Sequence, residues 1–498
     1  MTYLKESIRS SKDSRSEIAM GTTLPFLRLL TSEELKQIDQ TGRRILERIG
    51  IRILDGDVLK RLKDEGAQVD YDDQRVRFEG GWLDQVVNRA PPSFDLYSRD
   101  GKNDLHLGEG NVYFGNGGRV FRVLDMATGG YRLTKLMDVG NTASLVHNLD
   151  NLRFYIIACQ AHDIKPVNYH LLDFYYALNH TTKHVMGGCT DLHGAEQMWK
   201  LASIIAGGED IFREKPFVSI ITNTVSPLTI EANTLEIIDF CANRGIPVTC
   251  APAPIAGATS PATLAGTLSQ LHAEALAGVA LAQVLAPGAK VLYGAVPTIM
   301  DLRKMDFTLG SVEMAMMNAS AVQLAKLYNL PIYASAGVTE AKRPDIQAGF
   351  EKTVSCLTVA MTGADYIHLA AGMLDSANSI SYEQYVIDNE IIGMINRVLS
   401  GINVNEDTMA FDVIERVGSG GNFITDDHTI DHMTDEFFYP NLSVRSNFDI
   451  WEERGKQNML SQAYTRVREI LEDGTDGLLD HDTIADIKRA FTGSRLIW

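Results

Sequence analysis

The segment PIYASAGVTEAKRPDIQAGFEK, residues 331–352, decides how the chain folds. Its first six residues form an apolar run of strand length, which Gly337 interrupts before a polar loop and a segment with helical periodicity. A strand, a loop and a helix in this order make one βα unit. The segment also raises a functional question, because the predicted strand ends at a residue without a side chain, Gly337.

Seven further segments repeat this pattern, and neighbouring runs start 30 to 43 residues apart with a helix-period segment between them. They are NVYFG from Asn111, RFYIIAC from Arg153, KHVMGGC from Lys183, FVSIITN from Phe217, PVTCAPA from Pro247, KVLYGAV from Lys290 and DYIHLAAG from Asp365. Continuous apolar runs are typical of strands covered on both faces, as in a parallel sheet. The sequence therefore predicts the α/β class and a (β/α)8 TIM barrel.

The segments before and after the barrel predict two flanking regions. Upstream, SEELKQIDQTGRRILERIG and GDVLKRLKDEG have amphipathic helical patterns that each end at glycine. Downstream, the long helical pattern EQYVIDNEIIGMINRVLSGI begins at Glu383. We therefore predict an N-terminal α/β cap over residues 1–105, the barrel over 106–382, and a helical C-terminal region over 383–498 that packs on the barrel.

Composition narrows the possible partners and location. The chain has 46 basic and 64 acidic residues, and the net charge of −18 argues against nucleic acid as a partner. No apolar run reaches the roughly 18 to 20 residues of a membrane span, and the N-terminal stretch MTYLKESIRSSKDSRSE lacks the apolar core of a signal peptide. We expect a cytoplasmic protein, without a membrane partner, that forms a homo-oligomer.

The cysteines and the strand-end loops contain few catalytic signals. The five cysteines are dispersed without a C-x-x-C pair, so we expect buried thiols and no metal site. The loops after the eight runs are rich in Gly, Pro, Ser, Thr and Asn and poor in titratable groups. The cluster GNGGR from Gly115 is interpreted as a tight turn, with a phosphate-binding loop as the alternative.

Long stretches of the chain resemble the trimethylamine methyltransferase family, in its branch without pyrrolysine. The resemblance runs from SEELKQIDQTG nearly to the C-terminus. It is densest in SPLTIEANTLEIID, GATSPATLAGTLSQLHAEALAGVALAQVLAPGAKVLYG, PDIQAGFEKT and GMLDSANSISYEQYVIDNEIIGM. The resemblance implies an enzyme that takes a methyl group from a small amine and passes it to the Co(I) corrinoid of a partner protein. It implies no tightly bound cofactor, since the methylcobalamin forms on that corrinoid protein.

The resemblance also gives Gly337 a meaning, because the pyrrolysine position of the trimethylamine enzymes falls on it. A glycine there implies that trimethylamine is not the substrate and that a bulkier quaternary amine takes the free volume. Glycine betaine, giving dimethylglycine, is our first expectation, and proline betaine, carnitine or another quaternary amine is the alternative. A glycine needed only for a positive φ angle is the structural alternative.

Methyl transfer from a quaternary ammonium needs no general acid, because the amine departs neutral. Positioning then supplies most of the acceleration. Aromatic faces recognise such cations, and Tyr97, Phe114 and Tyr382 are our candidates. For a substrate carboxylate the candidates are Arg303 and His368, and Asn223 can add a neutral hydrogen bond. Ordinary packing is the alternative for the three aromatics, and a satisfied core imidazole is the alternative for His368.

Two other functions stay open at this point. A Schiff-base lyase on the same barrel would use Lys342, whose pKa would have to be lowered, although its charged loop EAKRPD predicts solvation. A non-catalytic betaine-binding protein would explain the aromatic residues equally well. Reductive trapping of an imine would distinguish a Schiff-base lyase from a methyltransferase. Methylation of an added corrinoid protein would distinguish a methyltransferase from a betaine-binding protein.

Overall fold

The computed structural model describes residues 27–165, 169–473 and 477–491. The N-terminal stretch MTYLKESIRSSKDSRSE, which is expected not to be a signal peptide, lies outside these residues. Among the described residues, every helix is too short or too polar to cross a membrane.

Eight parallel strands close into a barrel, which confirms the predicted (β/α)8 fold. Each strand coincides with one of the eight apolar runs of the sequence. The strands are β6 (Tyr113–Asn116), β9 (Phe154–Ile156), β10 (His184–Gly187), β11 (Val218–Asn223), β13 (Val248–Ala251), β15 (Val291–Ala295), β18 (Ile332–Ser335) and β19 (Tyr366–Ala371). Their continuous burial follows from the helices outside and the packed side chains inside.

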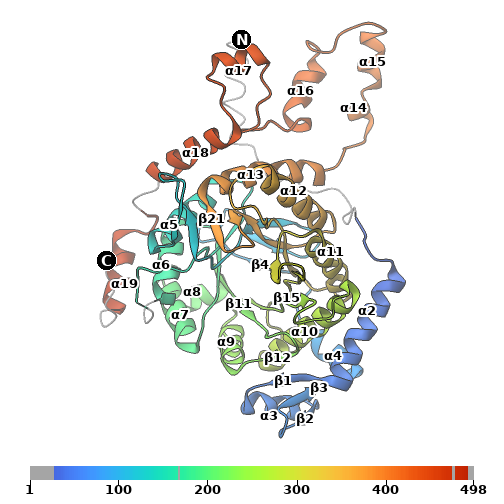
Figure 1. The fold of residues 1–498 in the computed structure, drawn as a ribbon, viewed down its shortest axis with the longest axis vertical. Coiled ribbons are helices and arrows are strands. Elements are labelled where there is room, and N and C mark those ends of the chain that lie inside the picture. The colour runs from blue at the N-terminus through green and yellow to red at the C-terminus, as the bar shows by residue number, and fades with distance from the viewer. Residues whose placement is uncertain (1–26, 166–168, 474–476, 492–498) are drawn as a thin grey trace.

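Helices surround the strands, as Figure 1 shows in a view roughly along the barrel. They are α5 (Leu136–Asn148), α6 (Tyr169–His180), α7 (Leu192–Ala206), α9 (Ala232–Ala242), α10 (Leu264–Leu285), α11 (Val312–Leu327), α12 (Ile346–Met361) and α13 (Tyr382–Leu399). A short helix, α8 (Glu209–Glu214), precedes β11. Helix α13, which begins the region predicted as C-terminal, contacts both α12 and α5 and so completes the ring.

An antiparallel hairpin closes the N-terminal end of the barrel. It consists of β4 (Phe94–Leu96) and β5 (Leu105–Leu107). Leu96, Leu105 and Leu107 are fully buried in one cluster with barrel residues such as Leu292 and Tyr366. The hairpin is therefore a hydrophobic plug under the strands.

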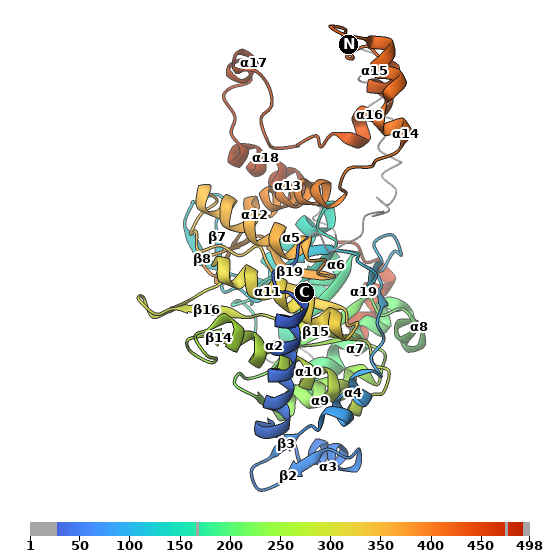
Figure 2. The same ribbon diagram turned by 90° about the vertical axis from the view of Figure 1, so that its right-hand side faces the viewer.

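Two small sheets flank the opposite, C-terminal end. One contains β14 (Ile255–Ala256), β16 (Thr298–Asp301) and β17 (Asp306–Thr308). The other contains β20 (Met373–Leu374), β21 (Ser379–Ser381), β7 (Arg122–Leu124) and β8 (Tyr131–Leu133). All seven strands come from βα loops, and the β16–β17 hairpin extends well beyond the barrel in Figure 2.

The N-terminal elements pack against one side of the barrel. They are α2 (Ser32–Arg44), the π-helical turn η2 (Ile45–Ile49), β1 (Ile51–Ile53), α3 (Gly56–Asp64), β2 (Gln68–Asp70), β3 (Arg75–Arg77) and α4 (Gly80–Val87). Strands β1 to β3 form a sheet that includes β12 (Thr229–Ile230), which comes from the loop after β11. Asp39 on α2 also binds His272 of α10 at 3.0 Å and the hydroxyl of Tyr328. The cap is thus joined to the barrel by backbone pairing and by buried polar contacts.

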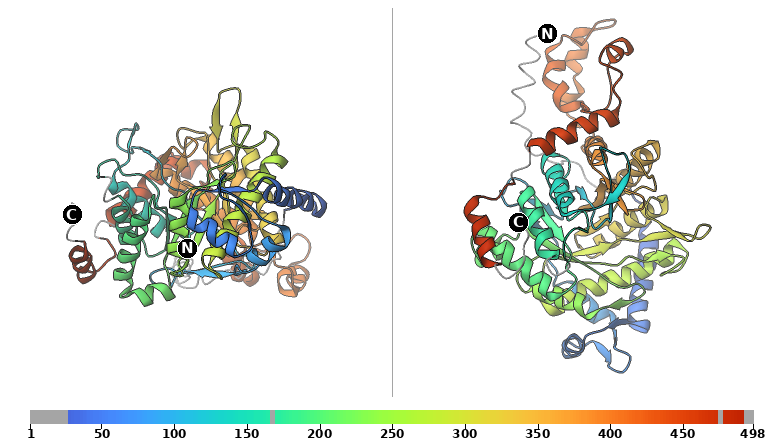
Figure 3. Two further views of the ribbon diagram at one scale, coloured as in Figure 1. Left: turned by 90° about the horizontal axis from the view of Figure 1, so that it is seen from below. Right: turned by 60° about the vertical axis from the view of Figure 1, so that its left-hand side comes forward.

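After α13 the chain leaves the barrel and then returns to it. Residues 401–458, which we call the arm, contain α14 (Glu406–Met409), α15 (Phe411–Val417), α16 (Asp427–Glu436) and α17 (Phe448–Glu453). The chain then packs α18 (Met459–Asp473) on α13 and α5, and α19 (His481–Ala490) beside α7, as Figure 3 shows. Two helices thus fasten the C-terminal region to the ring, while the arm lies outside it.

Candidate active site

Four stacked rings fill the barrel between the plug and the C-terminal end. Phe154 stacks on Tyr366 with ring centroids 3.5 Å apart, Tyr366 stacks on Tyr333 at 5.6 Å, and Tyr333 stacks on His368 at 3.9 Å. The register of β18 and β19 pairs Tyr333 with Tyr366 and Ser335 with His368, so all four side chains face inward. Because His368 lies two residues beyond Tyr366, its imidazole is the ring nearest the mouth.

His368 is neutral and held in place. Its Nε2 lies 2.7 Å from Oγ of Ser335, and the Ser335 hydroxyl donates to the carbonyl of Ala295 at 3.1 Å. With that hydroxyl proton directed to Ala295, Nε2–H of His368 donates to Ser335 and Nδ1 keeps a free lone pair. Burial lowers the pKa of His368 to about 3, so the ring carries no charge at physiological pH. It is 5% exposed.

The other inward-facing strand residues near the mouth carry no charge either. Asn223, at the end of β11, is exposed and follows Ile221 on the inward side of its strand. Its neighbours around the barrel interior are apolar: Ile156, Met186, Ala251 and Val296. Among the strand residues that the structure describes, the centre of the mouth therefore offers one amide, one hydroxyl and one neutral imidazole.

A pocket of about 400 Å³ lies at the edge of the mouth, between the loops that follow β6, β9 and β10. Two charged groups line it, the guanidinium of Arg119 and the carboxylate of Asp191, which accepts from the amide of Gly194 at 2.8 Å. Arg119 donates to Tyr169 Oη and to the carbonyl of Gly188, both at 2.7 Å, and its guanidinium lies 4.9 Å from the Tyr169 ring centroid. Beside it, Nε2 of His170 lies 2.8 Å from Oγ1 of Thr190. Burial lowers the pKa of His170 to about 4, so Arg119 is the cation of this pocket.

The loop after β18 contains Lys342, the lysine of the alternative Schiff-base lyase, and its solvated position, expected from the sequence, argues against that role. Lys342 forms an ion pair with Asp375, and its side chain is 62% exposed. Desolvation alone would lower its pKa, but the hydrogen bond and the charge of Asp375 raise the pKa above the usual value. A nucleophilic amine needs the opposite shift.

Gly337 lies directly after β18 in a buried turn with φ +80°. A Cβ at this position would lie 2.5 Å from Cα of Ala370 and 2.9 Å from Sγ of Cys356 on α12. The expected free volume is therefore absent in this direction, because a side chain would point at β19 and α12 and not at the substrate. The backbone itself requires glycine here, and a direct role of Gly337 in substrate binding stays a prediction.

A buried ion pair holds this turn. Lys352 on α12 and Asp388 on α13 are both 1% exposed, with Nζ 2.9 Å from Oδ2. Lys352 also donates to the carbonyl of Gly337, and Asp388 accepts from the amide of Gly372 at 2.8 Å. Since Gly337 and Gly372 end β18 and β19, one ion pair fixes the exits of the two strands that carry Ser335 and His368.

Three predicted site residues lie away from the mouth, which corrects the proposed cation cage. Tyr97 lies under the barrel, where its carbonyl accepts from His184 at the start of β10. Phe114 is 1% exposed and belongs to the core between strands and helices, because Gly115 is the β6 residue that faces the ring of Phe154. Arg303 has a side chain that is 94% exposed at the turn of the β16–β17 hairpin.

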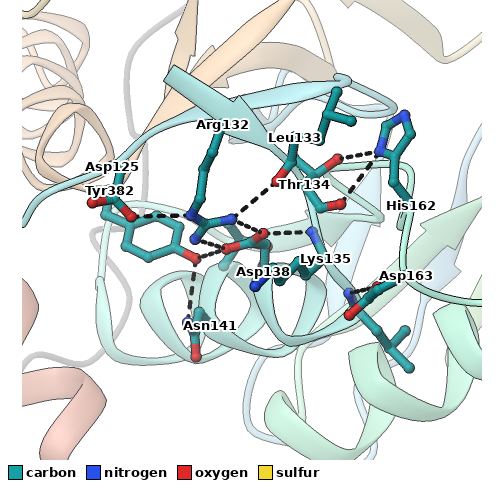
Figure 4. A network of polar contacts seen from close by, with 12 residues as sticks. Asp125, Arg132, Leu133, Thr134, Lys135, Asp138, Asn141, His162, Asp163 and Tyr382 are labelled. Atoms are coloured by element: carbon teal, nitrogen blue, oxygen red, sulfur yellow. Dashed lines mark hydrogen bonds and ion pairs between the residues drawn. The ribbon is translucent and has the colours of Figure 1, made fainter. Parts of the chain in front are cut away.

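Tyr382, the last predicted aromatic, belongs to a polar network behind the β7–β8 hairpin (Figure 4). Its hydroxyl donates to Asp138 of α5 and accepts from Asn141 at 3.2 Å. The carboxylate of Asp138 also accepts hydrogen bonds from both terminal guanidinium nitrogens of Arg132, each at 2.8 Å. The ring is 5% exposed, so Tyr382 holds α13 against α5. Of the six predicted binding residues, the structure thus brings Asn223 and His368 to the mouth.

The sequence interpretation missed the ring stack, Ser335 and Arg119. A period of two along the strands contained the signal for the stack, since Tyr333 and Ser335 alternate on β18 as Tyr366 and His368 do on β19. Arg119 sits at φ +65° after the GNGG turn, and no spacing rule marks such a loop residue.

The described cysteines are all free; four are buried and Cys189 is partly buried. Across residues 27–165, 169–473 and 477–491, no group of three or more His, Cys, Asp or Glu side chains is arranged to hold a metal ion.

A plugged barrel with its polar groups at the C-terminal mouth has the architecture of a TIM-barrel enzyme. A family model described as trimethylamine methyltransferase (MTTB) matches residues 5–495, and the chain belongs to this family of methyltransferases.

Named relatives span nearly the whole chain. The glycine betaine methyltransferase of Desulfitobacterium hafniense strain Y51 is 33% identical over 479 residues, covering 96% of this chain and 98% of its own. The trimethylamine methyltransferase MttB of D. hafniense strain DSM 10664 / DCB-2 is 35% identical over 458 residues, covering 92% of each chain. The structure of the Methanosarcina barkeri monomethylamine methyltransferase (MtmB) superposes with a TM-score of 0.50 at 13% identity over 89% of this chain and 92% of that one, a likeness of fold.

Proposed function

We propose that this methyltransferase demethylates a quaternary amine, with glycine betaine as the preferred substrate and dimethylglycine as the product, and that the acceptor is the Co(I) corrinoid of a partner protein. The observation that carries the proposal is the uncharged centre of the mouth, where neutral His368 lies on top of three aromatic rings. Proline betaine, carnitine and other quaternary amines are the alternative substrates.

The chemistry of the amine suits this centre. When the methyl carbon is displaced, the C–N bond breaks with its electron pair remaining on nitrogen, and the amine leaves neutral without a proton. No general acid is needed, and His368, with a pKa of about 3, could not serve as one at neutral pH. A neutral ring also attracts a quaternary ammonium, whereas an imidazolium would repel it.

The methyl acceptor supplies a strongly nucleophilic metal centre. The described residues do not fit a corrinoid resident in this chain, because the imidazole at the centre of the mouth is only 5% exposed and stacks on Tyr333. That argument, together with the family, supports an acceptor delivered on a separate protein. This chain's part is to hold the N-methyl group in line and to exclude water, which are positional tasks.

Arg119 replaces Arg303 as our candidate for the substrate carboxylate. It is the arginine that lines the pocket at the edge of the mouth, where the carboxylate of Asp191 is bound by the amide of Gly194, while Arg303 is solvated on a distant hairpin turn. Asn223 can add a neutral hydrogen bond from the end of β11, the strand next to β10. In this arrangement the cationic end of a betaine faces the centre and its anionic end faces Arg119.

The test is a demethylation assay with reduced cobalamin, and then with a corrinoid protein, over glycine betaine, proline betaine, carnitine, tetramethylammonium and trimethylamine. We expect turnover of quaternary amines and little turnover of trimethylamine. Arg119→Met should raise KM for glycine betaine by about ten- to a hundredfold, the usual cost of a charge-assisted hydrogen bond. It should leave tetramethylammonium, which has no carboxylate, unchanged.

Arg303→Met is the matched control and should behave like the parent enzyme with every substrate. If trimethylamine is turned over as efficiently as the betaines, the proposed substrate class is wrong. If Arg119→Met weakens both quaternary amines equally, Arg119 supports the loops and does not bind the carboxylate.

A further inference from the structure

The arm, residues 401–458, is an apolar projection without a core of its own. Every residue of α14, α15, α16 and α17 is described, and none of them is buried. Its exposed large apolar side chains are Ile402, Val404, Met409, Phe411, Ile414, Phe423, Ile424, Ile430, Phe437, Tyr439, Val444, Phe448 and Ile450. Phe411 is 70% exposed and Ile424 is 76% exposed. Monomeric proteins rarely leave so many apolar side chains in water.

The foot of the arm is firmly attached to α13. Glu390 accepts from the amides of Asn441, Leu442 and Ser443 at 3.0 to 3.2 Å. Arg397 donates from Nε to the carbonyl of Glu436 at 3.0 Å and pairs with the Glu436 carboxylate at 3.2 Å. The apolar parts of the arm are therefore presented from a fixed base.

Within the part of the chain that the structure describes, a second apolar surface has no partner, on the outer face of α11, α12 and α13. On α12, Ile346, Phe350 and Val354 recur every four residues and are 87%, 55% and 47% exposed. Helix α11 adds Val312 and Met316, and α13 adds Met394 and Val398, again four residues apart. Residues spaced by four share one face of a helix, so three neighbouring helices direct apolar side chains outward together.

We infer that two copies of this chain exchange arms, and that each arm covers the outer face of α11 to α13 of the other copy. Both surfaces belong to one chain and are present in equal numbers, which is what a self-complementary two-fold interface requires. The outer face is continuous with the base of the arm through α13, so two copies placed side by side can bury both surfaces at once.

The position and charge of the arm argue against other occupants. Figure 1 shows it outside the ring of helices and beside α13, whereas a protein that accepts the methyl group must reach the end of the barrel. The arm carries twelve acidic and four basic residues, which disfavours nucleic acid and anionic membrane surfaces. A second copy of the chain fits both surfaces.

Sedimentation and light scattering of the full chain over a range of concentrations test the inference. The parent protein should have twice the mass of the chain. The arm variant Phe411→Glu/Ile414→Glu and the face variant Ile346→Glu/Phe350→Glu should each raise the dimer dissociation constant by about thirtyfold or more, as loss of interface anchors does. The control Ile211→Glu, at an equally exposed site on α8, should leave it unchanged.

A crosslinking experiment fixes which surfaces meet. One tagged copy carries Phe411→Cys and a differently tagged copy carries Phe350→Cys; mixing them under mild oxidation should give a disulfide between the two tags. Cys159, Cys241, Cys250 and Cys356 are buried and should not compete, and Cys189→Ser in both copies removes the partly buried fifth thiol. A monomeric parent protein, or a dimer that neither double variant weakens, would overturn the inference. Because all variants change exposed residues, circular dichroism should show the secondary structure of the parent. The melting temperature of the two double variants should fall as the dimer is lost, because association stabilises the folded chain.

Discussion

The role of Gly337 is explained by its backbone conformation and by the atoms packed around it. The sequence marked it by position, and its surroundings determine its role: φ is +80°, and Ala370 and Cys356 occupy the space that a Cβ would need. The amide of Gly337 is also held in place, because it donates a hydrogen bond to Oγ of Ser355 at 3.0 Å. The glycine is thus a requirement of the turn that ends β18.

Gly337→Ala should lower the free energy of unfolding by about 2 to 4 kcal/mol, because left-handed strain and overpacking act together. Chemical denaturation measures it. The control is Gly349→Ala on α12, where no atom lies within 4 Å of the added Cβ and alanine should stabilise the helix by up to about 1 kcal/mol. Equal stability of the two variants would show that the backbone at residue 337 relaxes without strain.

Asp173 on α6 is a second residue whose surroundings determine its behaviour. It is fully buried, and neither carboxylate oxygen has a hydrogen-bond partner within the described residues. Burial raises its pKa to about 8, and the charge of Arg119 only partly opposes this. The folded protein therefore holds a proton here that the unfolded chain releases near pH 4.

This proton gives a prediction with a definite sign. Because the folded pKa is raised, the stability from Asp173 is complete below pH 4 and is lost as the pH rises toward 8. Asp173→Asn removes that loss, so the variant should gain stability over the parent as the pH rises from 5 to 8, by about 1.4 kcal/mol per unit at most. Urea unfolding at several pH values measures the difference; a difference independent of pH would mean that Asp173 is ionised and paired.

At the scale of elements, a buried ion pair joins α12 to α13. The sequence predicts each helix from its periodicity but does not predict the contact between them. Lys352 and Asp388 do more than neutralise each other, because each also binds the backbone of a strand exit. Burial raises the pKa of Asp388, and its stability as an anion therefore depends on the lysine.

Lys352→Met should lower the free energy of unfolding by about 3 to 5 kcal/mol, since it leaves a buried carboxylate unpaired. The double variant Lys352→Met/Asp388→Asn should lose clearly less than the sum of the single variants, because the amide keeps an acceptor for Gly372 without the charge. Arg466→Met on α18, which breaks an exposed ion pair, should cost less than about 1 kcal/mol. Additive losses in the double variant would exclude coupling between the two side chains.

The strands were predictable because each is a local apolar run with a turn signal behind it, as PIYASAG from Pro331 shows. The contacts that build the site were not. Ser335 meets His368 across 33 residues, and Lys352 meets Gly337 only after α12 folds back. The prediction that Tyr97 and Phe114 line a cation-binding cage was wrong for a related reason. Tyr97 precedes β6 and lies under the barrel, and Phe114 is on β6 but points outward into the core between strands and helices. The direction in which a side chain points, and its depth in the barrel, are set when the barrel closes and cannot be derived from the single segment.

At the scale of the whole molecule, composition and periodicity predict the barrel. They do not predict how the N-terminal sheet and the arm are joined to it. The strand β12, which continues the N-terminal sheet from a barrel loop, is two residues long and has no signal of its own. The arm has ordinary amphipathic helices, and only the complete fold shows that their apolar sides face solvent.

The β4–β5 plug has a consequence for kinetics. With Leu96, Leu105 and Leu107 sealing one end, the barrel is a cul-de-sac with a single entrance. If the methyl acceptor covers that entrance, the amine has to enter before the acceptor docks, and the demethylated product can leave only after the acceptor has undocked. Turnover then follows a compulsory order through a three-component complex, in which an excess of acceptor protein traps the product and slows the enzyme.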